Sequence, residues 1–176
     1  MTCKSELRAA VKERLAALSP EDFFNAGVKA AQKIVNIPRW NEYNSVLIFI
    51  SMKDEINTEP LINTILAAKK LLYVPHIIGN MLYFYPFGEE PEGILEDSHL
   101  GICMDNFPVL IITPGIAFDL SYNRLGRGKG YYDRFFAELD KLGHKYTALG
   151  LCMDCQLVDK VPAEWWDRKM DSLLVC

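Results

Sequence analysis

Short apolar runs alternate along this chain with amphipathic segments, and the alternation predicts strands separated by helices. The runs are rich in Val, Ile, Leu and aromatic residues, a composition typical of strands that are buried on both faces. We expect strands at 45–50, 71–74, 81–85, 109–113, 146–152 and 172–176. The second and third are close enough to pair across a turn at Gly79-Asn80.

Amphipathic segments precede the first of these runs and separate two pairs of neighbouring runs. Leu7, Val11, Leu15 and Leu18 recur at helical spacing, and Ser19-Pro20-Glu21-Asp22 carries the residues that start a second helix. We therefore expect helices at 3–18, 20–36, 58–70 and 131–142, and irregular structure at 86–108. Strands that alternate with helices predict an α/β fold, with a mostly parallel, Rossmann-like central sheet flanked by helices.

Two segments follow strands at the sheet edge where ligands bind in such folds. Ligands of open α/β sheets lie beyond the carboxyl ends of the strands. Ser51–Asn57 follows the first predicted strand, and Pro114–Gly130 follows the fourth. Both segments are therefore favoured places for a functional site.

The second of these segments contains alternating glycines and cations. Gly126, Gly128 and Gly130 flank Arg127 and Lys129, and a predicted helix begins directly afterwards. Glycines allow positive φ and close approach of the backbone to a ligand. Successive amides and a helix N-terminus favour an anion, so the loop indicates a site for phosphate groups.

The glycines alone are weak evidence, because such residues usually form a plain turn. The spacing differs from that of the Walker A loop and from G-x-G-x-x-G. However, residues 124–134 hold four cations and one acid on a chain with a formal charge of −4. A solvated basic loop is the alternative, but an anionic ligand explains this local charge of +3 better.

Length and composition limit the classes of protein. At 176 residues the chain suits one domain, 1–176, for which we expect a monomer, although the sequence does not fix the oligomeric state. A pI near 5.4 argues against general affinity for nucleic acid or anionic membranes. No apolar run approaches the roughly 18 residues of a membrane span, and the first residues lack an apolar signal core. We expect a cytoplasmic protein.

Five cysteines include one C-x-x-C pair, Cys152 and Cys155. An odd number without framework spacing indicates free thiols. A structural zinc site needs four ligands, and the sequence has no second pair. A redox or zinc role is the less favoured interpretation.

The glycine segment resembles the signature of the 5-formyltetrahydrofolate cyclo-ligase family. The resemblance rests on Pro-Gly-Ile-Ala-Phe-Asp at 114–119 and on Asn-Arg-Leu-Gly-Arg-Gly-Lys-Gly-Tyr-Tyr-Asp at 123–133. Three further pieces agree in order: the N-terminal 4–8, the segment 50–55 after the first strand, and the acidic 167–171. The resemblance covers essentially the whole chain, except that 88–108 departs from the family's usual sequence.

The family implies a function for this pattern. Its members use Mg²⁺ and ATP to close the formyl group of 5-formyltetrahydrofolate onto nitrogen 10, releasing ADP and phosphate. We expect phosphorylation of the formyl oxygen to create the leaving group. Positioning and charge neutralisation dominate such phosphoryl transfer, which agrees with a cationic glycine loop.

The resemblance also implies roles for individual residues. Arg127 and Lys129 would be catalytic, and Asp133 and Asp167 would hold Mg²⁺. The folate would contact Arg8, Ile50, Glu55, Arg127, Gly128, Lys129, Gly130 and Tyr131. ATP would contact Lys4, Ser5, Glu6, Leu7, Arg8, Arg124, Leu125, Gly126, Arg127, Gly128, Lys129, Gly130, Tyr131 and Tyr132.

Simpler interpretations of these residues stay open. Lys4 and Arg8 suit an exposed helix face, and Asp133 suits the first turn of a helix on dipole grounds alone. Tyr131 and Tyr132 suit either a helix core or contact with a flat pterin. Two other functions also remain: a non-catalytic protein that binds nucleotide or folate, and a sugar-phosphate enzyme, which rests on fold analogy alone.

Overall fold

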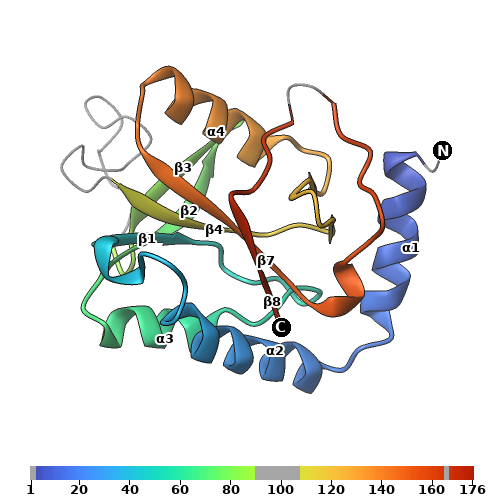
Figure 1. Cartoon of the computed structure of the whole chain (residues 1–176), viewed down its shortest axis with the longest axis horizontal. Coiled ribbons are helices and arrows are strands. Elements are labelled where there is room, and N and C mark those ends of the chain that lie inside the picture. The colour runs from blue at the N-terminus through green and yellow to red at the C-terminus, as the bar shows by residue number, and fades with distance from the viewer. Residues whose placement is uncertain (1–2, 90–107, 165–166) are drawn as a thin grey trace.

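The computed structural model describes residues 3–89, 108–164 and 167–176. Its centre is a six-stranded sheet in the order β3-β2-β1-β4-β7-β8 (Figure 1). The strands are β1 Ser45–Ile48, β2 Leu71–Ile78, β3 Met81–Pro86, β4 Val109–Thr113, β7 Tyr146–Cys152 and β8 Ser172–Val175. A separate two-stranded hairpin pairs β5, Ala117–Phe118, with β6, Arg124–Leu125.

The helices lie where the sequence predicted them, two before β1 and two between successive strands. They are α1 Lys4–Ala16, α2 Pro20–Ile34, α3 Glu59–Ala67 and α4 Tyr131–Lys141, with short 3-10 turns η1 Trp40–Glu42 and η4 Asp154–Gln156. The predicted capping serine is confirmed, since Ser19 Oγ accepts from Asp22 N at 3.2 Å. α3 ends earlier than the predicted residue 70, because Lys69 takes a left-handed φ of 56° that turns the chain toward β2.

All neighbouring strands of the large sheet are parallel except β2 and β3, which form an antiparallel hairpin at one edge. The predicted α/β class with a mostly parallel sheet is therefore confirmed. Gly79, with φ of 58°, makes the predicted turn. β2 runs to Ile78, past the predicted end at residue 74. Its second half pairs with the edge strand β3 and lacks a continuous apolar run, so the sequence did not mark it as a strand.

Side chains alternate between two cores, one on each face of the sheet. Val46 and Ile48 join the core that α1, α2 and α3 cover, whereas Leu47 joins the core under α4. Figure 1 shows α2 and α3 along one side of the sheet and α4 along the other. This three-layer arrangement explains why the sheet strands read as continuous apolar runs.

The strand order places a topological switch point between β1 and β4. From β1 the chain continues to β2 on one side, and from β4 it continues to β7 on the other. Such a reversal opens a crevice at the carboxyl ends of the two strands. Both segments that the sequence marked, 51–57 and 114–130, leave the sheet here.

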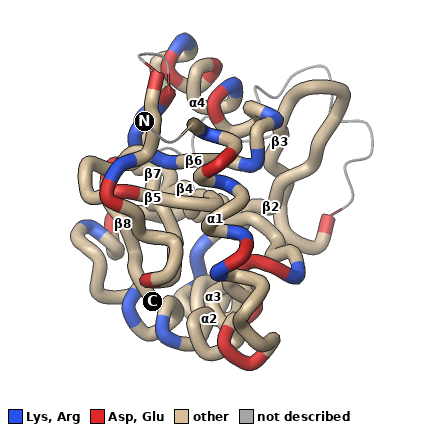
Figure 2. Tube along the Cα trace, turned by 90° about the vertical axis from the view of Figure 1, so that its right-hand side faces the viewer, with Lys and Arg blue, Asp and Glu red and all other residues tan. Residues whose placement is uncertain are grey.

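Charge is dispersed over the described chain. Figure 2 shows basic and acidic segments interspersed along the trace. Among the described helices, none combines the length and apolar character needed to cross a bilayer. Most of the segment predicted to be irregular, at 90–107, lies outside the described residues.

Candidate active site

A cleft of about 530 Å³ lies at the switch point, within the size range of small-molecule sites. Five parts of the chain line it: the start of α1, the segment after β1, the β2–β3 hairpin, residues 114–115 after β4, and residues 124–133 from β6 into α4. Asp167 completes the lining from the segment before β8. The cleft thus brings together residues from both ends of the sequence.

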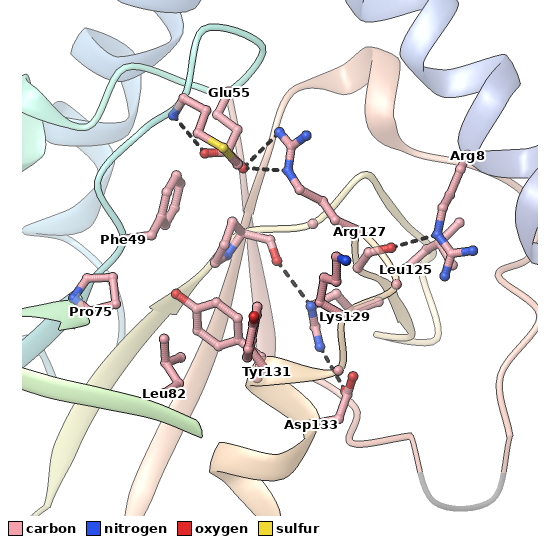
Figure 3. Close-up of a pocket in the computed structure, with 18 of the residues that line it drawn as sticks. Arg8, Phe49, Glu55, Pro75, Leu82, Leu125, Arg127, Lys129, Tyr131 and Asp133 are labelled. Carbon is pink, nitrogen blue, oxygen red and sulfur yellow. Dashed lines mark hydrogen bonds and ion pairs between the residues drawn. The ribbon is translucent and has the colours of Figure 1, made fainter. Parts of the chain in front are cut away.

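One part of the cleft is apolar. Phe49, Pro75, Leu82 and Tyr131 lie near one another in Figure 3 and surround an open space. Ile50 continues this wall toward the mouth, where half of its surface is exposed. An aromatic and aliphatic wall of this kind suits a flat, mostly apolar ligand.

The opposite part is the glycine loop, residues 124–130. Gly128 has φ of 95° and Gly130 has φ of 67°, in the left-handed region that glycine favours. Gly130 directly precedes α4, and no side chain caps that helix. The first turn of α4 therefore presents backbone N–H groups and the positive end of the helix dipole toward the loop.

Two cations stand beside this loop without a carboxylate partner among the described residues. Arg8 Nε donates to the carbonyl of Gly126 at 2.8 Å, which fixes the side chain but leaves its charge uncompensated. Its guanidinium lies against Gly128, where a Cβ would come within 3.6 Å of the central carbon. Lys129 points into the cleft between Arg8 and Tyr131 (Figure 3). Together they favour a polyanion at this end.

Arg127 is oriented differently, across the mouth of the cleft. Its guanidinium pairs with Asp54 at 2.7 Å and with Glu55 at 3.0 Å. The hydrogen bond from Arg127 is the main reason why the pKa of Asp54 lies below its ordinary value. Glu55 is held a second time, because its carboxylate accepts from Met52 N at 2.9 Å.

The two carboxylates predicted to hold Mg²⁺ both line the cleft, and each carries a cation. Arg124 donates to Asp133 at 2.8 Å, and Lys4 donates to Asp167 at 2.7 Å. Burial alone would raise the pKa of Asp167, but hydrogen bonds from Glu164 N and Lys4 outweigh it and lower that pKa. One oxygen of each carboxylate carries no protein hydrogen bond among the described residues.

This donor set fits Mg²⁺. The ion is usually held by one or two carboxylates together with phosphate oxygens and water. The described residues contain no group of three or more His, Cys, Asp or Glu side chains that could hold a metal ion. They therefore form no metal site from protein ligands alone. The two aspartates match the pattern in which a nucleotide supplies the remaining ligands.

Arg124 and Tyr132 form the buried base of the loop. The Arg124 guanidinium lies 5.5 Å from the centre of the Tyr132 ring. Only 5% of the Arg124 side chain is exposed. The Tyr132 hydroxyl is buried and has no hydrogen-bond partner among the described residues, and burial raises its pKa. Leu125 is buried as well. These three residues hold the loop in place as much as they face the cleft.

Three of the residues assigned to ATP lie outside the lining. Ser5 is exposed and contacts Cys3, while Glu6 accepts from Cys3 N at 2.8 Å as part of the α1 cap. Leu7 packs into the core. Lys4 and Arg8, four residues apart, are the members of this segment that line the cleft. Contact of ATP with the other three stays a prediction.

The sequence did not mark several of the residues that line or support the cleft. Phe49, Pro75 and Leu82 are ordinary core types, and only the period-two alternation of an edge hairpin marks the last two as facing one side. Asp54 was passed over beside Glu55, although an acid after a strand at the switch point was a usable signal.

The C-x-x-C pair does not resemble a reactive site. Cys152 is fully buried, and burial raises the pKa of its thiol to about 12. Reactive thiols have lowered pKa values and partial exposure. The four described cysteines are free.

Comparison with known proteins gives the same family as the glycine segment. A model described as the 5-formyltetrahydrofolate cyclo-ligase family matches residues 1–176. The 5-formyltetrahydrofolate cyclo-ligase of Escherichia coli K12 is 33% identical over 178 aligned residues, 93% of this chain and 95% of that protein. The mouse protein of the same name is 28% identical, over 98% of this chain and 93% of its own.

Solved structures support the same assignment. The NMR structure of Aquifex aeolicus 5,10-methenyltetrahydrofolate synthetase is 29% identical, with a TM-score of 0.76 over 98% of this chain and 89% of that chain. A 5,10-methenyltetrahydrofolate synthetase from Mycoplasma pneumoniae shares the fold, with a TM-score of 0.77 at 20% identity over 97% and 96% of the two chains. The resemblance inferred from the glycine segment is confirmed: the chain belongs to the 5-formyltetrahydrofolate cyclo-ligase family.

Proposed function

We propose that this protein converts 5-formyltetrahydrofolate to 5,10-methenyltetrahydrofolate, consuming ATP in the presence of Mg²⁺ and releasing ADP and phosphate. The observation that carries the proposal is the juxtaposition, in one cleft, of an apolar aromatic wall and a glycine loop with two uncompensated cations, Arg8 and Lys129. A reduced folate suits the wall, and a polyphosphate suits the loop. The names of the relatives agree with a reduced folate as the ligand of the wall.

The chemistry requires a leaving group. The oxygen of a formamide leaves poorly, so direct closure of the ring stalls. Transfer of the γ-phosphoryl group to that oxygen breaks the bond to ADP and activates the formyl carbon. Nitrogen 10 then attacks the carbon, the carbon–oxygen bond breaks, and phosphate departs with the former formyl oxygen. The proton of nitrogen 10 is released to the departing phosphate or to water.

The residues of the cleft supply positioning and charge. Lys129 and Arg127 are the cations that we assign to the transferring phosphate, and Arg8 with the amides of Gly128 and Gly130 would hold the rest of the polyphosphate. Phe49, Ile50 and Tyr131 would hold the folate, with Glu55 at its polar edge. A closed apolar wall also excludes water, which would otherwise hydrolyse the activated formyl group.

Asp133 and Asp167 are the residues that we assign to Mg²⁺. Each has an oxygen free of protein partners in the described structure and lines the cleft. The bound ion would neutralise charge on the β- and γ-phosphates. Lys4 and Arg124 keep these carboxylates in place, as partners of metal ligands commonly do.

The direct test is to mix the purified protein with 5-formyltetrahydrofolate, ATP and Mg²⁺ and to follow the absorbance of the methenyl product. We expect product and ADP in equal amounts, and no product when ATP is omitted. Absence of product from folded protein would overturn the proposal. Tight binding of both ligands without ADP formation would instead favour a binding protein, and binding of a phosphosugar without ATP would favour a sugar-phosphate enzyme.

We also propose that the protein acts as a monomer in the cytoplasm. The four described cysteines are free thiols, which agrees with a reducing compartment. Sedimentation of the purified protein would test the monomer, and fractionation of cells would test the location.

A further inference from the structure

The side chain of Arg127 connects two walls of the cleft. It rises from the glycine loop and meets the segment after β1, residues 51–57, where both Asp54 and Glu55 accept its hydrogen bonds (Figure 3 shows the contact with Glu55). These walls belong to parts of the sequence more than 70 residues apart. Among the described residues, no other ion pair joins the glycine loop to this segment.

The donors of Arg127 are almost fully used. A guanidinium has about five N–H groups. Nη1 and Nη2 donate to the two oxygens of Asp54 at 3.1 and 2.7 Å, and Nε and Nη2 donate to Glu55 at 3.2 and 3.0 Å. One N–H remains for a ligand. Arg127 therefore differs from Arg8 and Lys129, whose charges are free to meet a polyanion.

Of the two carboxylates, Asp54 forms the stronger ion pair with Arg127. Both of its oxygens face two nitrogens of one guanidinium, which is the geometry of the strongest arginine–carboxylate pairs. Glu55 contributes one oxygen to Arg127 and uses the other on Met52 N. Glu55 lines the cleft, whereas Asp54 lies outside the lining with 43% of its side chain exposed. Asp54 thus acts on the cleft only through Arg127.

The charges also separate the two ends of the cleft. The ion-paired cluster of two carboxylates and one guanidinium carries a net negative charge, whereas Arg8 and Lys129 place two positive charges at the other rim. A polyphosphate is therefore favoured at the second rim. The rim at Arg127 is continuous with Ile50 and Met52, which belong to the wall assigned to the folate.

We propose that Asp54 is a positioning residue for the folate: by holding Arg127 it ties residues 51–57 to the glycine loop and keeps the folate wall closed. The choice of ligand rests on the proposed function, while the tie itself does not. Loss of the tie loosens Glu55 and Ile50 together, because both lie on the segment that Arg127 anchors. The folate then binds less tightly, and the nucleotide rim is unaffected.

The test compares Asp54→Asn, which keeps the shape and removes the charge, with Asp159→Asn at an exposed site outside the cleft. For Asp54→Asn we expect the KM for 5-formyltetrahydrofolate to rise by about tenfold, the scale for one partly exposed paired carboxylate, with the KM for ATP unchanged within about twofold. Arg127→Gln should raise the folate KM similarly and should also lower kcat, because Arg127 is assigned to the transferring phosphate as well. In the folate KM, the double variant should be no worse than the worse single one. Asp54→Glu keeps the negative charge, so its KM for 5-formyltetrahydrofolate should lie between those of the wild type and Asp54→Asn.

A second measurement needs no turnover. Hydrogen exchange of the ligand-free protein should become faster at the amides of 51–57 in Asp54→Asn, and stay unchanged in the core strand β4 and in Asp159→Asn. Unchanged exchange at 51–57, or a rise in the KM for ATP instead of folate, would overturn the proposal. If the wild-type protein forms no methenyl product, the proposed function fails, and the exchange measurement still decides whether Asp54 ties the two walls.

Discussion

The ammonium of Lys4 donates to Oδ2 of Asp167 at 2.7 Å, and this ion pair joins the first turn of α1 to the segment before β8. The two residues are 163 positions apart. Arg124 and Asp133 form a comparable pair at 2.8 Å across the base of the glycine loop. Both proposed metal ligands are therefore already held by a cation, so they need little reorganisation to meet an incoming Mg²⁺.

Replacement of Asp167 by Asn tests the metal assignment. The variant keeps the shape of the side chain but removes the negative charge that Mg²⁺ requires. We expect the concentration of free Mg²⁺ for half-maximal activity to rise by about tenfold or more. The measurement is a titration of Mg²⁺ at saturating ATP, with Asp159→Asn as the matched control. The same Mg²⁺ requirement in both variants would remove Asp167 from the metal site.

Lys129 tests the role of the glycine loop in phosphoryl transfer. Its side chain is exposed and has no ion-pair partner in the described structure, so its charge is available to a ligand. Lys129→Ala should lower kcat by about 10²–10³, the usual scale for losing one group that stabilises the transition state. The melting temperature should stay unchanged, since exposed substitutions rarely affect stability. Turnover equal to that of the wild type would remove the catalytic role of Lys129.

The sequence predicted the part of this molecule in which local chemistry is decisive. The runs at 45–50, 109–113 and 146–152 are continuous because β1, β4 and β7 are buried on both faces, so their positions were readable. The loop 124–130 was readable because its glycines and cations have few structural reasons to alternate. Both features are properties of short segments.

The sequence did not reveal features that depend on contacts between residues far apart along the chain. Pro75 and Leu82 face the cleft only because the β2–β3 hairpin lies beside β1, and nothing in their residue types marks this role. The assignment of Arg127 to phosphate, made from its place in the loop, stays a prediction, but nothing local indicated that its guanidinium also reaches Asp54 across the cleft. A local motif gives the type of side chain that is present, and the tertiary fold decides what that side chain meets.

The backbone of the loop gives a further prediction through Gly128. Its φ of 95° is unfavourable for any residue with a Cβ, at a cost of about 1–3 kcal/mol. Gly128→Ala should therefore displace the loop and weaken binding of ATP by about tenfold. Calorimetric titration of ATP into the folded variant measures this change.

Gly79→Ala is the matched control. Gly79 also has positive φ, 58°, and a Cβ there would meet nothing within 4 Å. It lies in the β2–β3 turn and outside the residues that line the cleft. We expect this variant to lose stability and to bind ATP like the wild type. Equal loss of ATP binding in both variants would show that general destabilisation, and not the loop, is responsible.

Asp119 gives a prediction about stability and pH. It is 2% exposed, and its carboxylate accepts from Ser121 N at 2.9 Å, Asn123 N at 3.0 Å and Val161 N at 2.8 Å. Burial alone would raise the pKa of Asp119, but the hydrogen bond from the Asn123 side-chain amide at 2.9 Å, followed by those from the backbone N–H groups, outweighs it and lowers that pKa. The residue thereby fixes the turn between β5 and β6, from which the glycine loop begins.

A carboxyl group with a lowered pKa in the folded state stabilises the protein above its unfolded pKa of about 3.9, and the contribution is lost as pH falls through the folded pKa. Asp119→Asn places an amide donor against backbone donors, so its free energy of unfolding at pH 7 should be lower by about 1–3 kcal/mol. The difference from the wild type should narrow as the pH falls below about 4. Urea unfolding of both proteins at several pH values measures it, and a difference that stays constant with pH would contradict the role given to the ionised carboxylate.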